Sequence, residues 1–75
     1  MKFIELSGSV FRDVVNEDEM PENAFEDAGI KNHSVLRINQ QGDIELRRTD
    51  SWDVIGGLIG DFENRIRSAT GLEWA

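Results

Sequence analysis

The side chains of this chain that could carry chemistry are one histidine, five serines and fifteen carboxylates. A serine nucleophile needs a base that a third group holds in place, and His33 is the one candidate for that base. The sequence has no nucleophile-elbow pattern, and a single histidine in a chain without cysteine is a poor metal site. A catalytic carboxylate pair needs a cleft, for which a domain of 75 residues has little room. We therefore expect no enzyme, no cofactor and no metal.

Glycine is concentrated in one stretch of the sequence, at positions 56, 57 and 60. The stretch is not a phosphate-binding loop, because no Lys-Ser or Lys-Thr pair follows it. Gly56 and Gly60 would lie one turn apart on a helix, where small residues allow a close approach. One interpretation, which we favour, is that this helix packs closely on its own sheet. The other is an interface with a second helix, such as one from a second copy of the chain.

Two tryptophans are further candidates for contact with a partner. Trp52 opens an apolar stripe and is predicted to anchor the core, although Trp is also enriched in interface hot spots. Trp74 follows the last predicted helix. Its ring either folds back onto the core or is offered to a partner, and the sequence favours neither interpretation.

Charge is distributed unevenly along the chain. The net charge is −7, and residues 1–30 hold eight acids against two bases. The run Glu17, Asp18 and Glu19 is interpreted first as a solvated connector and second as a docking surface for a basic protein. It lacks the alternating ligands and the glycine of a calcium loop. Lysine and arginine are not clustered, so direct binding to nucleic acid or to an anionic membrane is not expected.

The elements that must position these residues begin with a strand over residues 1–6. Residues 9–15 are rich in β-branched and aromatic side chains. We favour a second strand there, paired across a Ser7-Gly8 turn, over a helix. A short helix is predicted over 21–28, with Gly29 as its left-handed cap.

A second hairpin is the clearest local prediction. Residues 35–39 and 43–47 flank Gln40-Gln41-Gly42, a three-residue loop with glycine in the left-handed position. One face of the hairpin is then aliphatic and the other carries a charge pair, as a half-buried sheet requires. The predicted register pairs Ile38 with Ile44, Arg37 with Glu45, and Leu36 with Leu46.

A long helix is predicted from Asp50 or Ser51 to Gly71. Apolar residues in this segment recur at steps of three and four, which is the period of an amphipathic helix. The spacing of Asp61 and Arg65 suits an ion pair along that helix. The recurring residues are Trp52, Ile55, Ile59, Phe62, Ile66 and Ala69.

The sequence therefore predicts one α+β domain over residues 1–75. An antiparallel sheet of three or four strands, made of two hairpins, carries a short helix and a long C-terminal helix packed on one face. The predicted core consists of Ile4, Leu6, Leu36, Ile38, Ile44, Leu46, Ile55, Ile59, Phe62 and Ile66.

The function expected of such a domain is that of a non-enzymatic protein–protein interaction module: a small adaptor, regulator or subunit. Its partner would be another protein, and a basic surface would suit the acidic run. One alternative is an acidic inhibitor that mimics nucleic acid against a basic enzyme, and another is a homodimeric assembly domain. A chain without cysteine or a signal peptide favours the cytoplasm. The residues assigned to contact are Trp52, Gly56, Gly60, Trp74, Glu17, Asp18 and Glu19.

Overall fold

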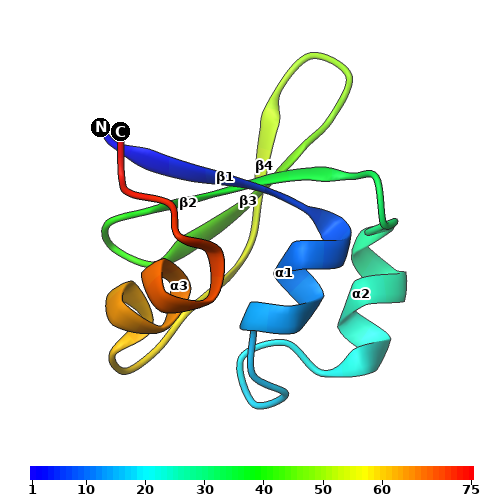
Figure 1. Ribbon diagram of the computed structural model, residues 1–75. Coiled ribbons are helices and arrows are strands. Elements are labelled where there is room, and N and C mark those ends of the chain that lie inside the picture. Colours follow the sequence, from blue (N-terminus) through cyan, green and yellow to red (C-terminus); the bar gives the residue numbers. More distant parts are fainter.

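The computed structural model describes all 75 residues and places seven elements along the chain (Figure 1). The four strands form one antiparallel sheet in the order β1-β2-β3-β4, and all three helices lie on one side of it. The α+β class and the antiparallel sheet are thus as predicted. No helix is long and apolar enough to cross a membrane. The elements are β1 (Phe3–Ser7), α1 (Gly8–Val14), α2 (Glu22–Ala28), β2 (Val35–Asn39), β3 (Asp43–Arg47), β4 (Trp52–Gly57) and α3 (Phe62–Thr70).

The face of the sheet that meets the helices is aliphatic. Six alternate residues of β1, β2 and β3 fill this face, because successive side chains of a strand point to opposite faces. All six belong to the predicted core, and Ile66 of α3 joins the same buried cluster, also as predicted. The six residues are Ile4, Leu6, Leu36, Ile38, Ile44 and Leu46.

The hairpin of β2 and β3 has the predicted register, with Arg37 opposite Glu45. Gly42 has a φ of 91°, the left-handed conformation that the three-residue loop requires. The side-chain oxygen of Asn39 also holds the loop, because it accepts hydrogen bonds from the backbone N–H groups of Gln41 (2.9 Å) and Asp43 (3.0 Å). Local turn chemistry therefore fixes this part of the sheet.

Residues 8–14 form helix α1, so the predicted first hairpin is wrong. The side chain of Ser7 caps the helix by accepting a hydrogen bond from Val10 N–H at 3.2 Å. Phe11 and Val14 share the buried side of the helix, and their burial outweighs the β propensity of the segment. Strand β1 pairs with β2 instead, across a connection that contains α1 and α2.

The start of α1 lies against the segment before β2. Gly8 N–H donates to Ser34 O at 2.8 Å, and Ser9 N–H donates to Asn32 O at 3.1 Å. A Cβ atom at position 8 would overlap the carbonyl oxygen of Lys31. This junction therefore requires glycine because two backbone segments approach closely.

Helix α2 agrees with the prediction. It follows Pro21 and ends at Gly29, which is left-handed with a φ of 76°. Ile30 N–H donates to Phe25 O at 2.9 Å and closes the last turn, and both side chains are buried. The rings of Phe11 and Phe25, with centroids 5.8 Å apart, join α1 to α2.

The predicted long C-terminal helix is wrong in its first half. Residues 52–57 form the edge strand β4, and α3 begins only at Phe62 and has nine residues. Trp52 and Ile55, three residues apart, lie on opposite faces of the strand: Trp52 contacts Arg37, whereas Ile55, the extra residue of a β-bulge in the β3–β4 pair, packs against the core. Gly60 has a φ of 70°, which is incompatible with a right-handed helix. The end of α3 at the left-handed Gly71 is as predicted.

The core also contains residues that the sequence did not assign to it. Ile59, predicted to be buried, is 58% exposed because it lies in the loop after β4 rather than on a helix. Ile55 and Phe62 are partly buried and pack against the core. The additional core residues are Phe11, Val14, Met20, Phe25, Ile30, Leu58 and Trp74.

Candidate functional site

One face of the sheet is covered by the helices and the other is not (Figure 1). Cross-strand partners share a face, so Glu5, Arg37, Glu45 and Val54 form one row across the uncovered side. We refer to this side as the open face. Its three acids, Glu5, Asp43 and Glu45, stand against two bases, Arg37 and Arg47, so the open face carries only −1 of the protein's net charge of −7. The open face consists of Phe3, Glu5, Ser7, Val35, Arg37, Asn39, Asp43, Glu45, Arg47, Trp52 and Val54.

A cation stacked between two aromatic rings occupies the centre of the open face. The guanidinium of Arg37 lies 3.9 Å from the ring centroid of Phe3 and 4.2 Å from that of Trp52. Its Nη2 donates to Glu45 Oε1 at 3.0 Å. These four residues, the Arg37 stack, come from four different strands. Each cation–π contact contributes about 0.5–2 kcal/mol, so the stack ties the sheet together and fixes both rings.

Aliphatic side chains flank the Arg37 stack. Val54 is 63% exposed and Val35 is 41% exposed. Charged residues such as Glu5 and Arg47 surround them on the same face. An apolar group with a charged rim is typical of a protein-binding surface. Rings that are already fixed add to this property, because they lose little conformational entropy on binding.

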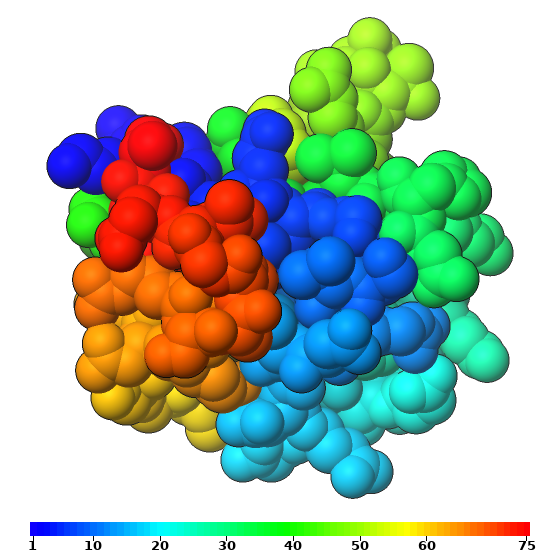
Figure 2. Space-filling view, viewed as in Figure 1, coloured from blue at the N-terminus to red at the C-terminus, as the bar shows by residue number.

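Strand β4 leaves one edge of the sheet unpaired. At the start of the β3–β4 pair, Arg48 N–H donates to Ser51 O at 2.7 Å. Hydrogen-bonded and non-hydrogen-bonded pairs alternate in an antiparallel ladder, so Trp52 and Val54 turn their backbone N–H and C=O groups away from β3. The β3–β4 turn beside this edge projects from the body of the molecule (Figure 2).

The opposite edge, at β1, is partly closed by the chain itself. Phe3 and Ala75 exchange two backbone hydrogen bonds, of 3.0 and 3.1 Å, which hold the last residues beside the first strand (Figure 1). Trp74 is only 9% exposed, and its ring meets that of Phe62 edge-on with centroids 6.3 Å apart. The ring of Trp74 therefore docks on the core and presents no surface to a partner.

Gly56 and Gly60 do not share a helix face, so the helical spacing predicted for them is wrong. Gly56 lies in β4, where a Cβ atom would meet Met20 Cε at 3.4 Å and Ile44 Cδ1 at 3.7 Å, which are ordinary contact distances. Gly60 lies in the loop before α3. A role for either glycine in an interface stays a prediction.

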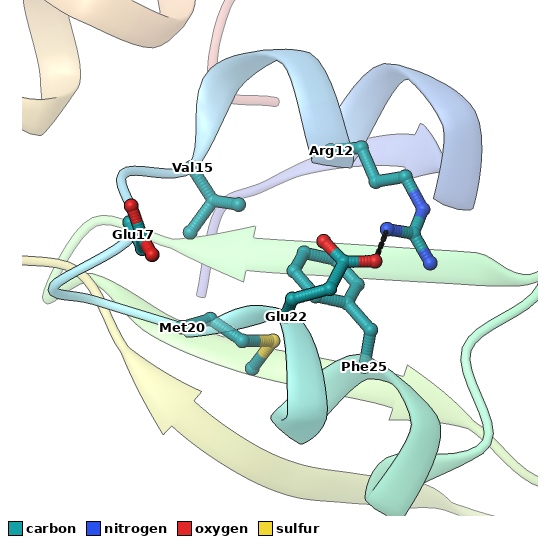
Figure 3. A pocket seen from close by; sticks show the side chains of 6 residues that line it. All are labelled: Arg12, Val15, Glu17, Met20, Glu22 and Phe25. Carbon is teal, nitrogen blue, oxygen red and sulfur yellow. Dashed lines mark hydrogen bonds and ion pairs between the residues drawn. The ribbon is translucent and has the colours of Figure 1, made fainter.

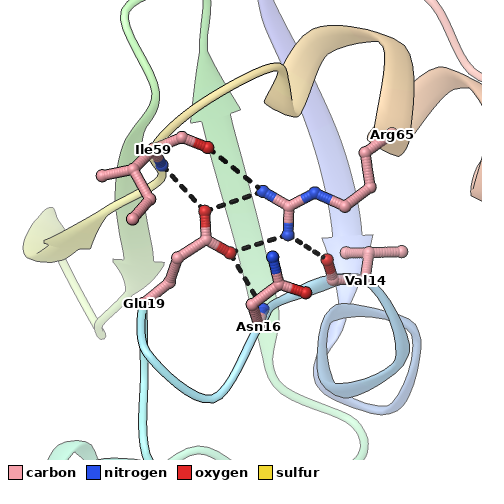
Figure 4. Close-up of polar contacts among 5 residues, drawn as sticks. All are labelled: Val14, Asn16, Glu19, Ile59 and Arg65. Carbon is pink, nitrogen blue, oxygen red and sulfur yellow. Dashed lines mark hydrogen bonds and ion pairs between the residues drawn. The ribbon is translucent and has the colours of Figure 1, made fainter.

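The acidic run divides into two exposed residues and one buried residue. Glu17 and Asp18 are exposed. The side chain of Glu19 is fully buried and forms two hydrogen bonds with Arg65, each of 2.7 Å (Figure 4). Its carboxylate also accepts from Ile59 N–H at 2.7 Å. Glu19 thus joins the α1–α2 connection to α3, and its contacts are internal to the fold.

The environment of Glu19 fixes its charge. Burial alone would raise the pKa of this carboxyl, but the hydrogen bonds from Arg65 and from the N–H groups of Ile59 and Asn16 outweigh the burial. The pKa of Glu19 is lowered from 4.5 to about 2. The hydrogen bond to Glu19 also raises the pKa of Arg65. Arg65 therefore takes Glu19, rather than the predicted Asp61, as its ion-pair partner.

A hollow of about 380 Å³ lies between α1, α2 and the connection that joins them (Figure 3). Arg12 is already engaged there, because its Nη1 donates to Glu22 Oε1 at 2.8 Å and its guanidinium lies 4.3 Å from the ring centroid of Phe25. Glu17 is the one other charged side chain in the hollow and has no partner there. The hollow thus has no second unpaired polar side chain that could act with Glu17 as an acid or a base. Its lining consists of Arg12, Val15, Glu17, Met20, Glu22 and Phe25.

No group of three or more His, Cys, Asp or Glu side chains is placed to hold a metal ion. Comparison with protein-family models, with curated proteins and with solved structures finds no match.

Trp52, predicted both as a core anchor and as a contact residue, lies on the open face and outside the core, and the sequence does not identify its neighbours there. The predicted pairing of Arg37 with Glu45 is the one sequence signal for this face, and the structure contains that pair. Phe3 and Val54 carry no such signal, because their positions depend on how β1 and β4 join the sheet.

Proposed function

We propose that this protein is a non-enzymatic interaction module that binds another protein through the open face of its sheet. The observation that carries the proposal is the one-sided arrangement of the helices, which leaves Val35, Val54 and the Arg37 stack uncovered. A sheet that packs its core on one face usually keeps the other face polar. An apolar group on a preordered surface is what a protein partner buries.

The chemistry of the open face indicates the kind of partner. The face itself is nearly neutral, and its exposed aliphatic groups are Val35 and Val54. Binding through it depends on apolar contact, so the affinity should change little with ionic strength. The partner therefore needs an apolar patch rather than a basic one.

An acidic inhibitor that mimics nucleic acid is a second candidate, and a different surface supports it. Exposed carboxylates gather on α2 and on the connection before it, away from the open face. A basic enzyme bound there would be released as salt rises. The lack of cysteine suits a reducing compartment such as the cytoplasm for either candidate. The carboxylates are Glu17, Asp18, Glu22, Glu26 and Asp27.

Affinity capture with matched valine variants tests the proposal. Val54 stands on the open face and Val10 on α1, at the helical side, and both are exposed. Immobilised wild-type, Val54→Lys and Val10→Lys proteins are incubated with cell extract at low and at high salt. We expect one partner to bind the wild type and Val10→Lys at both salt concentrations. The same partner should not bind Val54→Lys. A partner that binds Val54→Lys as well as the wild type and dissociates at high salt would favour the acidic inhibitor instead.

A further inference from the structure

Strand β4 has few of the features that keep edge strands from pairing, and its β-bulge lies at Ile55, beyond the residues 52–54 that would pair. Natural proteins guard such edges with lysine, proline, β-bulges or inward-pointing charges. The strand has neither lysine nor proline, and its one charge, on Asp53, is neutralised by Arg48, whose Nε and Nη2 donate to Asp53 at 3.2 and 2.9 Å. Arg48 is itself fixed by donating to Ala28 O at 3.0 Å. The edge is therefore unpaired and electrically neutral.

The geometry of this edge is complementary to itself. Trp52 and Val54 point their backbone groups outward, and Asp53 between them points its groups toward β3. If two such edges pair antiparallel about a twofold axis beside Asp53, Trp52 of each copy lies opposite Val54 of the other. Four backbone hydrogen bonds then form. On the open face Trp52 of one copy and Val54 of the other become direct cross-strand neighbours, which reduces the exposure of a valine that is 63% exposed in the single chain.

The segments beyond these three residues leave room for the pairing. Beyond Val54 the β-bulge at Ile55 ends the regular register, and Gly56 and Gly57, which follow it near the turn at 49–51 of the other copy, have no side chains to collide with that turn. Asp53 of each copy faces its counterpart, but each carboxylate keeps its own Arg48 and so remains neutralised.

We infer that β4 binds β4 of a second copy and joins two four-stranded sheets into one of eight strands. The chain that pairs with β4 is a second copy, because one twofold axis brings three features opposite their complements: the outward backbone groups, the Trp52–Val54 pairs and the Arg48–Asp53 charges. The inference rests on the proposed function, since it names a partner for the β4 side of the open face. The contact is small compared with the about 800 Å² per partner of a stable complex, so we expect a Kd on the order of 100 μM.

Ionic strength gives this dimer a distinctive signature. Two chains that each have a net charge of −7 repel one another at long range. The contact itself is neutral, so salt that screens the repulsion should tighten the dimer. Docking through the exposed acids would weaken under the same change.

Sedimentation velocity tests the dimer over concentrations from about 10 μM to about 1 mM, which bracket the expected Kd. Val54→Lys places on the edge the residue that natural proteins use against pairing, and Val10→Lys is the control for the same chemical change elsewhere. Thermal melts establish that both variants are folded. We expect the mass of the wild type and of Val10→Lys to rise from 8.5 kDa toward twice that value, more so at high salt. The affinity of Val54→Lys should fall at least tenfold.

A single introduced cysteine tests the register, because the chain has none of its own. In the proposed pairing the two copies of Asp53 form a non-hydrogen-bonded pair, with Cα atoms about 4.5 Å apart. That separation suits a disulfide. Asp53→Cys should therefore oxidise to a linked dimer at least tenfold faster than Val10→Cys, and adding Val54→Lys to the Asp53→Cys chain should remove the difference.

Three results would overturn the inference. They are a wild type that stays monomeric at every concentration, a dimer that Val54→Lys leaves intact, and cross-linking at position 53 no faster than at position 10. In each case, capture of a foreign protein that depends on Val54 would still support the proposed function. A failure of the dimer and a failure of the open face as a binding surface are therefore distinguishable.

Discussion

The buried ion pair between Glu19 and Arg65 makes a quantitative prediction about acid stability. The pKa of Glu19 is lowered from 4.5 to about 2, and one pKa unit corresponds to about 1.4 kcal/mol, so the ionised carboxylate stabilises the fold by about 3 kcal/mol at neutral pH. A domain of 75 residues has a total stability of about 4–11 kcal/mol. Glu19→Gln should therefore lower the melting temperature at pH 7 by roughly 10–25 °C.

The sign of the pH dependence follows from the lowered pKa of Glu19. The folded state keeps the carboxylate ionised at pH values where the unfolded chain binds a proton. The stabilisation is therefore complete above the unfolded pKa of 4.5 and is lost as the pH falls toward about 2. Wild type and Glu19→Gln should differ fully at pH 7 and converge near pH 2. Glu17→Gln, the same change at an exposed neighbour, is the control and should leave stability nearly unchanged.

Urea unfolding followed by circular dichroism between pH 2 and pH 7 measures both effects. The free energy of unfolding is compared for the wild type, Glu19→Gln and Glu17→Gln at each pH. Two results for Glu19→Gln would refute the reasoning: a loss of unfolding free energy below about 1 kcal/mol at pH 7, as for an exposed pair, or an equal loss at pH 7 and pH 2. Either would show that the ionised pair does not stabilise the junction between the α1–α2 connection and α3.

Two further changes test the packing that supports the sheet. Gly8→Ala should destabilise the protein by more than about 3 kcal/mol, because the added Cβ overlaps the carbonyl oxygen of Lys31. Gly57→Ala, whose Cβ would have its nearest neighbour at 3.9 Å, should be tolerated, and thermal melting compares the two. Deletion of residues 74–75 should cost roughly 3 kcal/mol, because it removes a buried indole and two hydrogen bonds to Phe3. An unchanged urea midpoint would show that this indole is not docked.

The elements that the sequence predicts well are those fixed by neighbours along the chain. In the β2–β3 hairpin, strand alternation and the left-handed Gly42 act within a few residues of one another. Helix α2 is likewise closed by Gly29 and by the hydrogen bond from Ile30 to Phe25. No distant contact is needed to choose these structures.

The elements that the sequence predicts poorly depend on distant contacts. Residues 9–15 have the composition of a strand, but Phe11 is buried against Phe25 of another helix, and that burial selects the helix. The spacing of Trp52 and Ile55 would put both on one face of a helix, but in the strand they lie on opposite faces. Pairing with β3 selects the strand, and a single sequence does not show that pairing.

The same distinction applies to the candidate site. The Arg37–Glu45 pair follows from the local hairpin, whereas the stacking of Phe3 and Trp52 on Arg37 requires the positions of β1 and β4. Glu19 resembles its acidic neighbours in the sequence. Only the fold brings Arg65, 46 residues away, within 2.7 Å of it.

Backbone NMR of the labelled chain over a concentration series tests most directly whether β4 is where this protein meets another chain. We predict that the amide signals of Trp52 and Val54 and the indole signal of Trp52 shift together as the concentration rises, while the signals of α2 stay in place. Shifts confined to α2 and to Glu17 and Asp18, or no shift up to about 1 mM, would contradict the assignment of β4 as the binding edge.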